Sequence, residues 1–210
     1  MKFCAPCLFG VEGLLSDELK RMDIKNVTPE NGCVTFEGDM KTLCRVNLRS
    51  RVAERVLLVL GEFPARSFDE LFENVKKLPL ENYIGRTDAF PVKGWSLNSK
   101  LHSVPDIQKI IKKAMVSRLS NYYGISWFEE TGAKNQIQFS ILKDRARIMI
   151  ETSGEGLHKR GYRENANAAP IRETLAAAMA YAARVYPDSV MYDPFCGSGT
   201  FPIEAAMMAA

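Results

Sequence analysis

One short segment, Asp193–Thr200, constrains the fold of this chain more than any other part of the sequence. The apolar residues 190–192 come directly before it and predict a strand, whereas residues 200–210 predict the opening of a helix. Within the segment, Gly197 and Gly199 allow the backbone to turn sharply and to approach a ligand closely. A turn of this kind is typical of the ligand site beside the first strand of an open α/β sheet.

Three classes of ligand compete for such a turn. A phosphate-binding P-loop requires a lysine and a hydroxyl residue after its last glycine, but Thr200 and Phe201 follow Gly199 here. A dinucleotide-binding turn requires a third glycine where this sequence has Pro202. Asp193 with two glycines suits a cofactor that carries a positive amino-acid end and no phosphate. S-adenosylmethionine is such a molecule, and we expect it to be the cofactor.

The first sixty residues alternate in a pattern that predicts a β-α-β-β-α-β order, the ferredoxin-like arrangement. Helical spacing of apolar residues runs from Val11 to Met22, and Asn31-Gly32 marks a turn between the second and third strands. Asp39 is a candidate N-cap for a second helix, with Leu43, Val46 and Leu48 on its apolar side. The expected strands are 2–8, 24–28, 32–37 and 56–60.

A second pattern follows from Pro64 onwards. A long helix is expected after Ser103, with an apolar stripe that runs from Ile107 to Tyr122 and an end at Gly124. Lys112 and the other basic residues of this helix lie largely off the stripe and are expected to face solvent. The remaining expected elements are a helix at 68–78, strands at 87–96, 137–141 and 146–150, and a turn at Lys143-Asp144.

Residues 152–169 contain several glycines and no apolar period, so they read as a linker segment. An alanine-rich helix is expected from Pro170 to about Tyr186. The chain is therefore expected to be α+β in its first part and α/β in its last part, which would be incomplete. The expected segments are a ferredoxin-like domain at 1–62, a second domain at 63–157, a linker at 158–169 and the start of an α/β domain at 170–210.

Charge and composition exclude some classes of protein. No apolar run approaches the 18 or so residues that a membrane span requires, and five scattered cysteines do not form the framework of a small secreted protein. We therefore expect a cytoplasmic protein with neither a membrane partner nor a metal site. The net charge is only +3, but residues 93–118 hold six basic residues against one acid. Such clustering suits either a nucleic-acid backbone or a solvated helix face.

The cofactor turn and several segments before it together resemble one family. Asp193–Thr200 looks like the first cofactor motif of class I methyltransferases that act on exocyclic amino groups of nucleobases. The blocks upstream of it are similar to THUMP-domain RNA methyltransferases, in particular to the bacterial enzymes that make N2-methylguanine in large-subunit ribosomal RNA. These blocks are Phe90–Gly94, Ser99–Leu101, Ser103–Asp106, Thr152–Arg163 and Ala169–Leu175.

The resemblance implies a ferredoxin-like domain, a THUMP domain that binds RNA, and a Rossmann-like methyltransferase domain that starts near the end of this chain. It also implies roles for individual residues. Asp193, Phe195, Gly197 and Gly199 would line the S-adenosylmethionine site. Pro170, Ile171 and Thr174 would close its methionine end. Our candidates for RNA phosphate contacts are Lys93, Lys100, Arg160 and Arg163.

The family's catalytic motif, an asparagine or aspartate before Pro-Pro and an aromatic residue, is expected beyond Ala210, so no catalytic residue is assigned. We expect methyl transfer to guanine N2, in ribosomal RNA rather than in transfer RNA, and we expect this chain to be inactive alone. A DNA amino-methyltransferase would share residues 193–200 but not the THUMP-like block. An RNA-binding module without catalysis would leave those residues without a purpose, although binding alone is reasonable for this chain.

Four conspicuous side chains differ in the roles that we expect for them. Cys196 has no histidine near it in sequence and is expected to pack rather than to act as a nucleophile. For Trp95 and Trp127, we expect a position in the core rather than a role in stacking on bases. Tyr162, between basic residues of the linker, is the better candidate for stacking.

Overall fold

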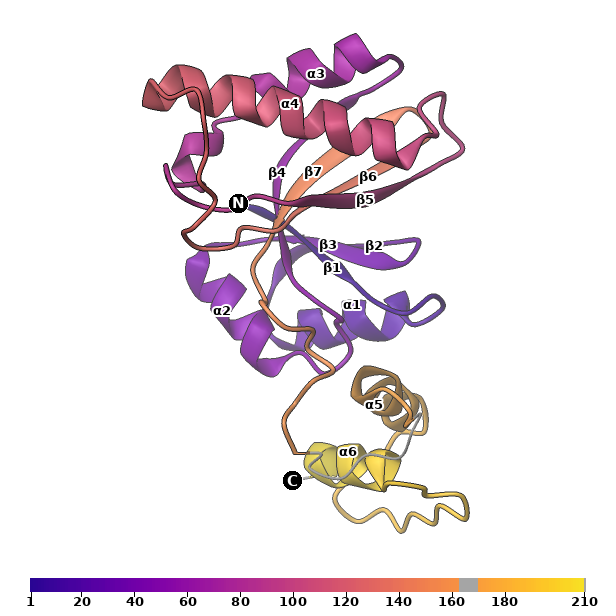
Figure 1. Ribbon diagram of the computed structural model, residues 1–210. Helices are drawn as coiled ribbons and strands as arrows, with labels where there is room; N and C mark the ends of the chain where they lie inside the picture. The colour runs from indigo at the N-terminus through magenta and orange to yellow at the C-terminus, as the bar shows by residue number, and fades with distance from the viewer. Residues whose placement is uncertain (163–169, 210) are drawn as a thin grey trace. The chain divides into compact units, whose positions relative to one another are not determined.

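The computed structural model describes residues 1–162 and 170–209 (Figure 1). Two compact units make up the chain. The first unit combines Met1–Leu57 with Thr152–Ala210, and the second is the continuous segment Leu58–Glu151. The second unit is therefore an insertion into the first.

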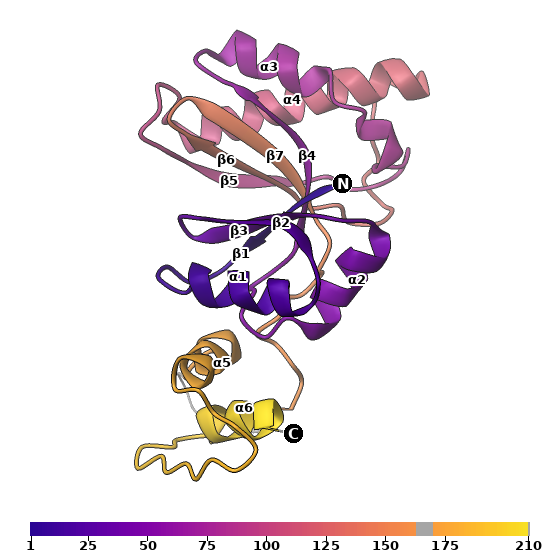
Figure 2. The same cartoon turned by 180° about the vertical axis from the view of Figure 1, so that it is seen from behind.

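The first unit opens with the elements expected of a ferredoxin-like domain. They are β1 (Lys2–Pro6), α1 (Glu12–Arg21), β2 (Lys25–Glu30), β3 (Cys33–Glu37) and α2 (Met40–Arg49), and β4 (Leu57–Pro64) starts at the last residue of the segment. The strand order is β2-β3-β1 with antiparallel pairing, and α1 and α2 lie on the same side of these strands (Figures 1 and 2). The predicted β-α-β-β-α-β order is confirmed.

Side chains from β1, β3 and the two helices form the core of this segment. Phe3 pairs with Phe36 across the strands, and their rings stack with centroids 5.3 Å apart. Asp39 caps α2 as expected, because its Oδ1 accepts a hydrogen bond from the Thr42 N–H at 2.8 Å. Leu48, which was expected on the apolar side of this helix, is instead 85% exposed.

The second unit contains four strands in the order β4-β7-β6-β5. Strand β5 (Val92–Leu97) pairs in parallel with β6 (Ile137–Leu142), and β6 pairs antiparallel with β7 (Arg145–Glu151). Both helices of this unit, α3 (Phe68–Lys76) and α4 (Val104–Tyr123), pack against each other over one face of these strands (Figures 1 and 2). A short 3-10 helix, Leu80–Asn82, follows α3.

Turn residues of the second unit behave as the sequence predicts. Gly124 ends α4 in the left-handed conformation, with φ of 64°. Lys143 and Asp144 form the β6–β7 turn, and both also have positive φ. Tyr122 departs from expectation, since it is 61% exposed rather than part of the apolar stripe.

The C-terminal segment of the first unit contains two helices that pack against each other, α5 (Glu173–Ala182) and α6 (Thr200–Ala209). The strand predicted at residues 190–192 does not form, and Val190 and Tyr192 are 100% and 86% exposed. A parallel strand needs neighbouring strands for its backbone hydrogen bonds, and no described residue pairs with this segment. Within residues 1–162 and 170–209, no helix has the length and apolar character to cross a bilayer.

Candidate cofactor turn and basic surfaces

The Asp193–Thr200 turn has a defined backbone conformation. Gly197 and Gly199 have φ of 52° and 74°, the left-handed region in which glycine carries no steric penalty. Asp193 Oδ1 accepts a hydrogen bond from the Phe195 N–H at 3.0 Å, so this carboxylate shapes the turn from inside. Helix α6 begins at Thr200, so the N–H groups that open the helix lie at the turn.

Side chains at the tip of the turn are open to solvent. Phe195 is 92% exposed, and Cys196 is also exposed. The expectation that Cys196 packs in the interior is therefore wrong. A cysteine side chain is buried only when neighbouring elements cover it, and the described residues do not cover Cys196.

The segment predicted to close the methionine end of the cofactor site contacts the ferredoxin-like part of the chain. Thr174 is buried, and its hydroxyl donates a hydrogen bond to the Glu54 carboxylate. Arg172 and His158 also lie beside this carboxylate, each with a nitrogen 3.4 Å from Glu54 Oε2. Glu54 thus ties the start of α5 to the end of the first domain, a role that the sequence did not predict.

Another carboxylate, Glu204 of α6, is buried and contacts the linker. Its side chain is 0% exposed, and its Oε2 lies 2.6 Å from Arg160 Nη1 and 3.6 Å from Arg51 Nη1. Its Oε1 accepts a hydrogen bond from the Tyr162 hydroxyl at 2.8 Å. Burial, together with this hydrogen bond to a carboxylate, raises the pKa of Tyr162.

These contacts bear on two sequence predictions. Tyr162 points its hydroxyl into the protein, which leaves it poorly suited to stack on a base. Arg160 is engaged with Glu204 and with the Arg51 carbonyl, so a simple exposed phosphate contact does not describe it. Arg163 lies outside the described residues.

A third carboxylate, Glu18, joins α1 to the segment after α2. It accepts hydrogen bonds from the Ser50 hydroxyl and the Arg51 N–H, both at 2.7 Å. The Tyr181 hydroxyl of α5 lies 3.4 Å from the same carboxylate. Burial raises the pKa of Glu18 despite these donors, because the ionised form loses its hydration.

The other two predicted RNA contacts belong to the second unit. Lys93 lies on β5, and its side chain is 47% exposed with Nζ 3.3 Å from Glu151 Oε2. Lys100 is exposed, and its N–H donates to Asp144 Oδ1 at 2.7 Å, which fixes the backbone after β5. Both side chains therefore start from ordered backbone, and the Lys93 ammonium is also engaged with Glu151.

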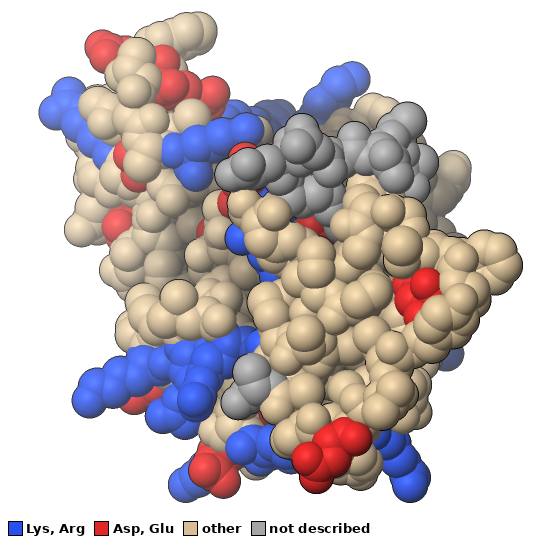
Figure 3. Space-filling view, turned by 90° about the horizontal axis from the view of Figure 1, so that it is seen from below, with Lys and Arg blue, Asp and Glu red and all other residues tan. Residues whose placement is uncertain are grey.

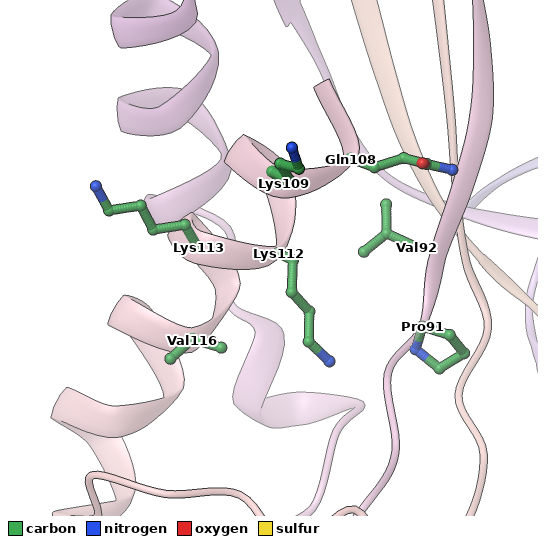
Figure 4. Close-up of a pocket in the computed structure, with 7 residues that line it drawn as sticks. All are labelled: Pro91, Val92, Gln108, Lys109, Lys112, Lys113 and Val116. Atoms are coloured by element: carbon green, nitrogen blue, oxygen red, sulfur yellow. The ribbon is translucent and has the colours of Figure 1, made fainter. Parts of the chain in front are cut away.

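A pocket of about 530 Å³ lies between the start of β5 and α4 (Figure 4). Lys109, Lys112 and Lys113 line it, but they do not all face solvent as expected. The Lys112 ammonium lies 3.4 Å from the centroid of the Phe90 ring and donates to the Phe90 carbonyl. It also pairs with Glu130. Lys112 therefore holds the chain before β5 in place, which corrects the prediction of a solvated residue.

Both tryptophans contradict the sequence prediction of a core position. Trp95 on β5 is 49% exposed, and Trp127 after α4 is 79% exposed. The core of the second unit is filled instead by aliphatic residues and by Phe90 and Phe139. Neither indole takes part in a ring stack or cation–π contact among those found in the described residues.

Comparison with protein families gives matches along most of the chain. The RlmL ferredoxin-like domain matches residues 2–57, the THUMP domain matches residues 65–151, and the RMKL-like methyltransferase domain matches residues 160–210. The chain therefore matches three domains in the order that its sequence predicts.

Curated relatives agree with these matches. "Putative RNA methyltransferase YpsC" of Bacillus subtilis is 45% identical over 95% of this chain, which spans 52% of that protein. "Ribosomal RNA large subunit methyltransferase K/L" of Magnetococcus marinus is 35% identical over 99% of this chain, which spans 30% of that protein. The chain thus spans between about a third and a half of the length of these relatives.

Solved structures show the same fold. A protein from Listeria monocytogenes described as a predicted N6-adenine-specific DNA methylase is 48% identical, with a TM-score of 0.93. "SMU.472, a putative methyltransferase complexed with SAH" is 44% identical, with a TM-score of 0.91. Each alignment covers 99% of this chain and 55% of the solved chain.

Proposed function

We propose that this chain takes part in RNA methylation, because it matches an RlmL ferredoxin-like domain, a THUMP domain and an RMKL-like methyltransferase domain. The protein to which it belongs would transfer a methyl group from S-adenosylmethionine to an exocyclic amino group of a base, namely guanine N2 in large-subunit ribosomal RNA. The observation that carries this proposal is the glycine turn at 193–200, because it opens α6 inside the methyltransferase match.

The residues of the turn fit the proposed cofactor. Two glycines with positive φ leave the ligand side of the backbone free of Cβ atoms, and N–H groups at the start of α6 suit an acceptor on the ligand. A relative that is 44% identical has been crystallised with SAH, the demethylated product of S-adenosylmethionine. Asp193, Phe195, Gly197 and Gly199 are the proposed contacts, and Pro170, Ile171 and Thr174 are proposed to close the site.

S-adenosylmethionine would supply an electrophilic methyl group on a sulfonium, so the protein has to position the amine rather than form a covalent intermediate with it. The residues of this chain would contribute cofactor binding and orientation. Glu54 supports this task because its hydrogen bond fixes Thr174 at the start of α5. The residue that orients the amine is not assigned among the residues of this chain.

RNA as the substrate rests on the THUMP match and on the basic side chains of that domain. Lys93 and Lys100 are proposed to contact RNA phosphates from β5 and the segment after it. The names of the curated relatives favour RNA over DNA and ribosomal RNA over transfer RNA.

The activity is tested with the whole protein, RNA and DNA from a strain that lacks its gene, and S-adenosylmethionine with a labelled methyl group. Mass spectrometry of digested ribosomal RNA should detect N2-methylguanosine. Label in N6-methyladenine of DNA, with none in RNA, would overturn the proposal. Label in transfer RNA alone would retain the chemistry and correct the substrate.

The RNA contacts are tested by the double charge reversal Lys93→Glu and Lys100→Glu. Fluorescence anisotropy with a labelled single-stranded RNA should show binding weakened by about tenfold and a salt slope smaller by about 1.4, since two phosphate contacts are lost. The matched control is Lys20→Glu with Lys25→Glu, which makes the same charge change at exposed positions of the first unit. Equal effects in both variants would point to long-range charge alone and would remove these two contacts.

A further inference from the structure

A basic pocket of about 620 Å³ lies in the first unit, outside the THUMP match. Its walls come from the end of α2 and from residues 153–160, two segments about one hundred residues apart in the sequence. Arg49, Arg51, Lys159 and Arg160 supply four cations to this lining, and Glu155 supplies one carboxylate. We infer that this pocket binds a phosphate of the RNA backbone, as a contact of the ferredoxin-like domain.

The wall of the pocket holds more positive than negative charge. The guanidinium groups of Arg51 and Arg160 share a single carboxylate oxygen, Glu204 Oε2, at 3.6 Å and 2.6 Å. In the part of the chain that the structure describes, Glu204 is the acidic side chain that pairs with either arginine. Both arginines are half-buried or more, with side chains 27% and 16% exposed. A partly buried excess of positive charge is stabilised when an anion enters beside it.

Backbone carbonyls already accept from these two arginines, but they do not neutralise them. Arg51 Nη2 donates to the Met207 carbonyl at 2.7 Å, and Arg160 Nη2 donates to the Arg51 carbonyl. These bonds hold both guanidinium planes in fixed orientations. Because their Nη atoms are already engaged, the two arginines act on an anion through their fixed positive charge, and the direct contacts come from the rim.

The rim adds two cations that are accessible. Arg49 is exposed at the last position of α2. Lys159 is 60% exposed, and its pairing with Glu155 at 3.7 Å joins two solvated side chains, so it contributes little and breaks readily. With Glu204 and Glu155 both counted, the pocket retains about two positive charges. The partial negative charge at the end of α2, about half an elementary charge, opposes an anion but is smaller than this excess.

An RNA phosphate fits these observations better than a free phosphate ion. The cations are spread between an enclosed wall and an open rim, which suits a chain of phosphates that passes over the surface. This inference rests on the proposed function, because it takes RNA as the partner. It adds a contact that depends on neither Lys93 nor Lys100.

The test uses the double variant Arg49→Glu with Lys159→Glu, because both side chains are on the rim and outside the buried pairs. Anisotropy with a labelled 20-nucleotide single-stranded RNA between about 50 and 200 mM salt should show binding weakened about tenfold and a salt slope smaller by about 1.4. The conservative variant Arg49→Lys with Lys159→Arg should keep most of the affinity. The charge-matched control is again Lys20→Glu with Lys25→Glu.

Three results separate this inference from the proposed function. Unchanged affinity and slope in the rim variant, with loss in the Lys93 and Lys100 variant, would overturn the pocket and leave RNA binding intact. Absence of RNA binding by the unmodified protein would overturn both. If inorganic phosphate shifts the NMR signals of the Arg51 and Arg160 side chains while the rim variant still binds RNA normally, the pocket is a site for a free ion and the inference fails.

Discussion

The thiols of this chain differ widely in their surroundings. Cys4 is buried in β1, whereas Cys44 and Cys196 are exposed. Burial and the nearby Glu12 carboxylate raise the pKa of Cys7 to about 12. With this raised pKa, the Cys7 thiol is almost entirely protonated at neutral pH. It is therefore unreactive there, because the thiolate is the reactive form.

This difference predicts an order of alkylation. With iodoacetamide at pH 8, peptide mass spectrometry should show Cys44 and Cys196 modified first and Cys7 more slowly by at least tenfold. A raised pKa means that the thiolate fraction of Cys7 grows as the pH approaches 12, so its relative rate should increase with pH. Modification of Cys7 as fast as Cys196 at pH 8 would contradict the structure. Denatured chain, in which all thiols are equivalent, is the control.

At the scale of the secondary-structure elements, local patterns predicted most of what forms. Apolar spacing predicted α1 and α4, and alternation predicted β6 and β7, since these patterns follow directly from helix and strand geometry. The predicted strand at residues 190–192 failed because a strand also needs partners, which the local sequence does not supply. The same distinction applies to Lys112, whose ring and carbonyl partners at Phe90 lie 22 residues away.

Within the candidate site, too, residues with a local role were predictable and residues with distant contacts were not. Glycines at 197 and 199 were predictable, because a sharp turn before a helix requires their conformations. Glu54 and Glu204 were not, because their partners are distant in sequence: Thr174 lies 120 residues from Glu54, and Arg160 lies 44 residues from Glu204. An isolated glutamate carries no local signal of a buried contact.

Close approach of two strands gives a prediction for β5. A Cβ atom added at Gly94 would lie 2.1 Å from the Phe139 carbonyl oxygen on β6, which is backbone and cannot move aside easily. Gly94→Ala should therefore lower the free energy of unfolding by about 2–3 kcal/mol through overpacking, as measured by urea denaturation. Gly13→Ala is the matched control, since that glycine lies in α1 with no atom within 4 Å. It should be neutral or stabilising by up to about 1 kcal/mol.

At the scale of the whole molecule, large apolar side chains are exposed along the segment between α5 and α6. Tyr186, Val190, Tyr192 and Phe195 are 62% to 100% exposed. Viewed from the side on which α6 lies in Figure 1, a broad area carries no charged side chain (Figure 3). Large apolar side chains that are exposed close together mark a region that other protein atoms or a ligand cover.

This exposure predicts weak cofactor binding by the 210-residue chain. Calorimetry with S-adenosylmethionine should show no saturation at micromolar concentrations, because Phe195 and its neighbours lack the cover that would hold a ligand in place. The whole protein, measured in the same buffer, is the positive control. Micromolar affinity of the 210-residue chain would show that the turn and α5 suffice.

The insertion of Leu58–Glu151 into the first unit also has a consequence for the order in which the protein folds as it is synthesised. Ribosomes add about 5–20 residues each second. Ser153, whose hydroxyl accepts a hydrogen bond from the Val56 N–H, is therefore synthesised on the order of 10 s after Val56. The inserted unit emerges without interruption and can fold first. A pause in translation within the insertion would leave Glu54 without Thr174 and Glu18 without Tyr181 until synthesis resumes.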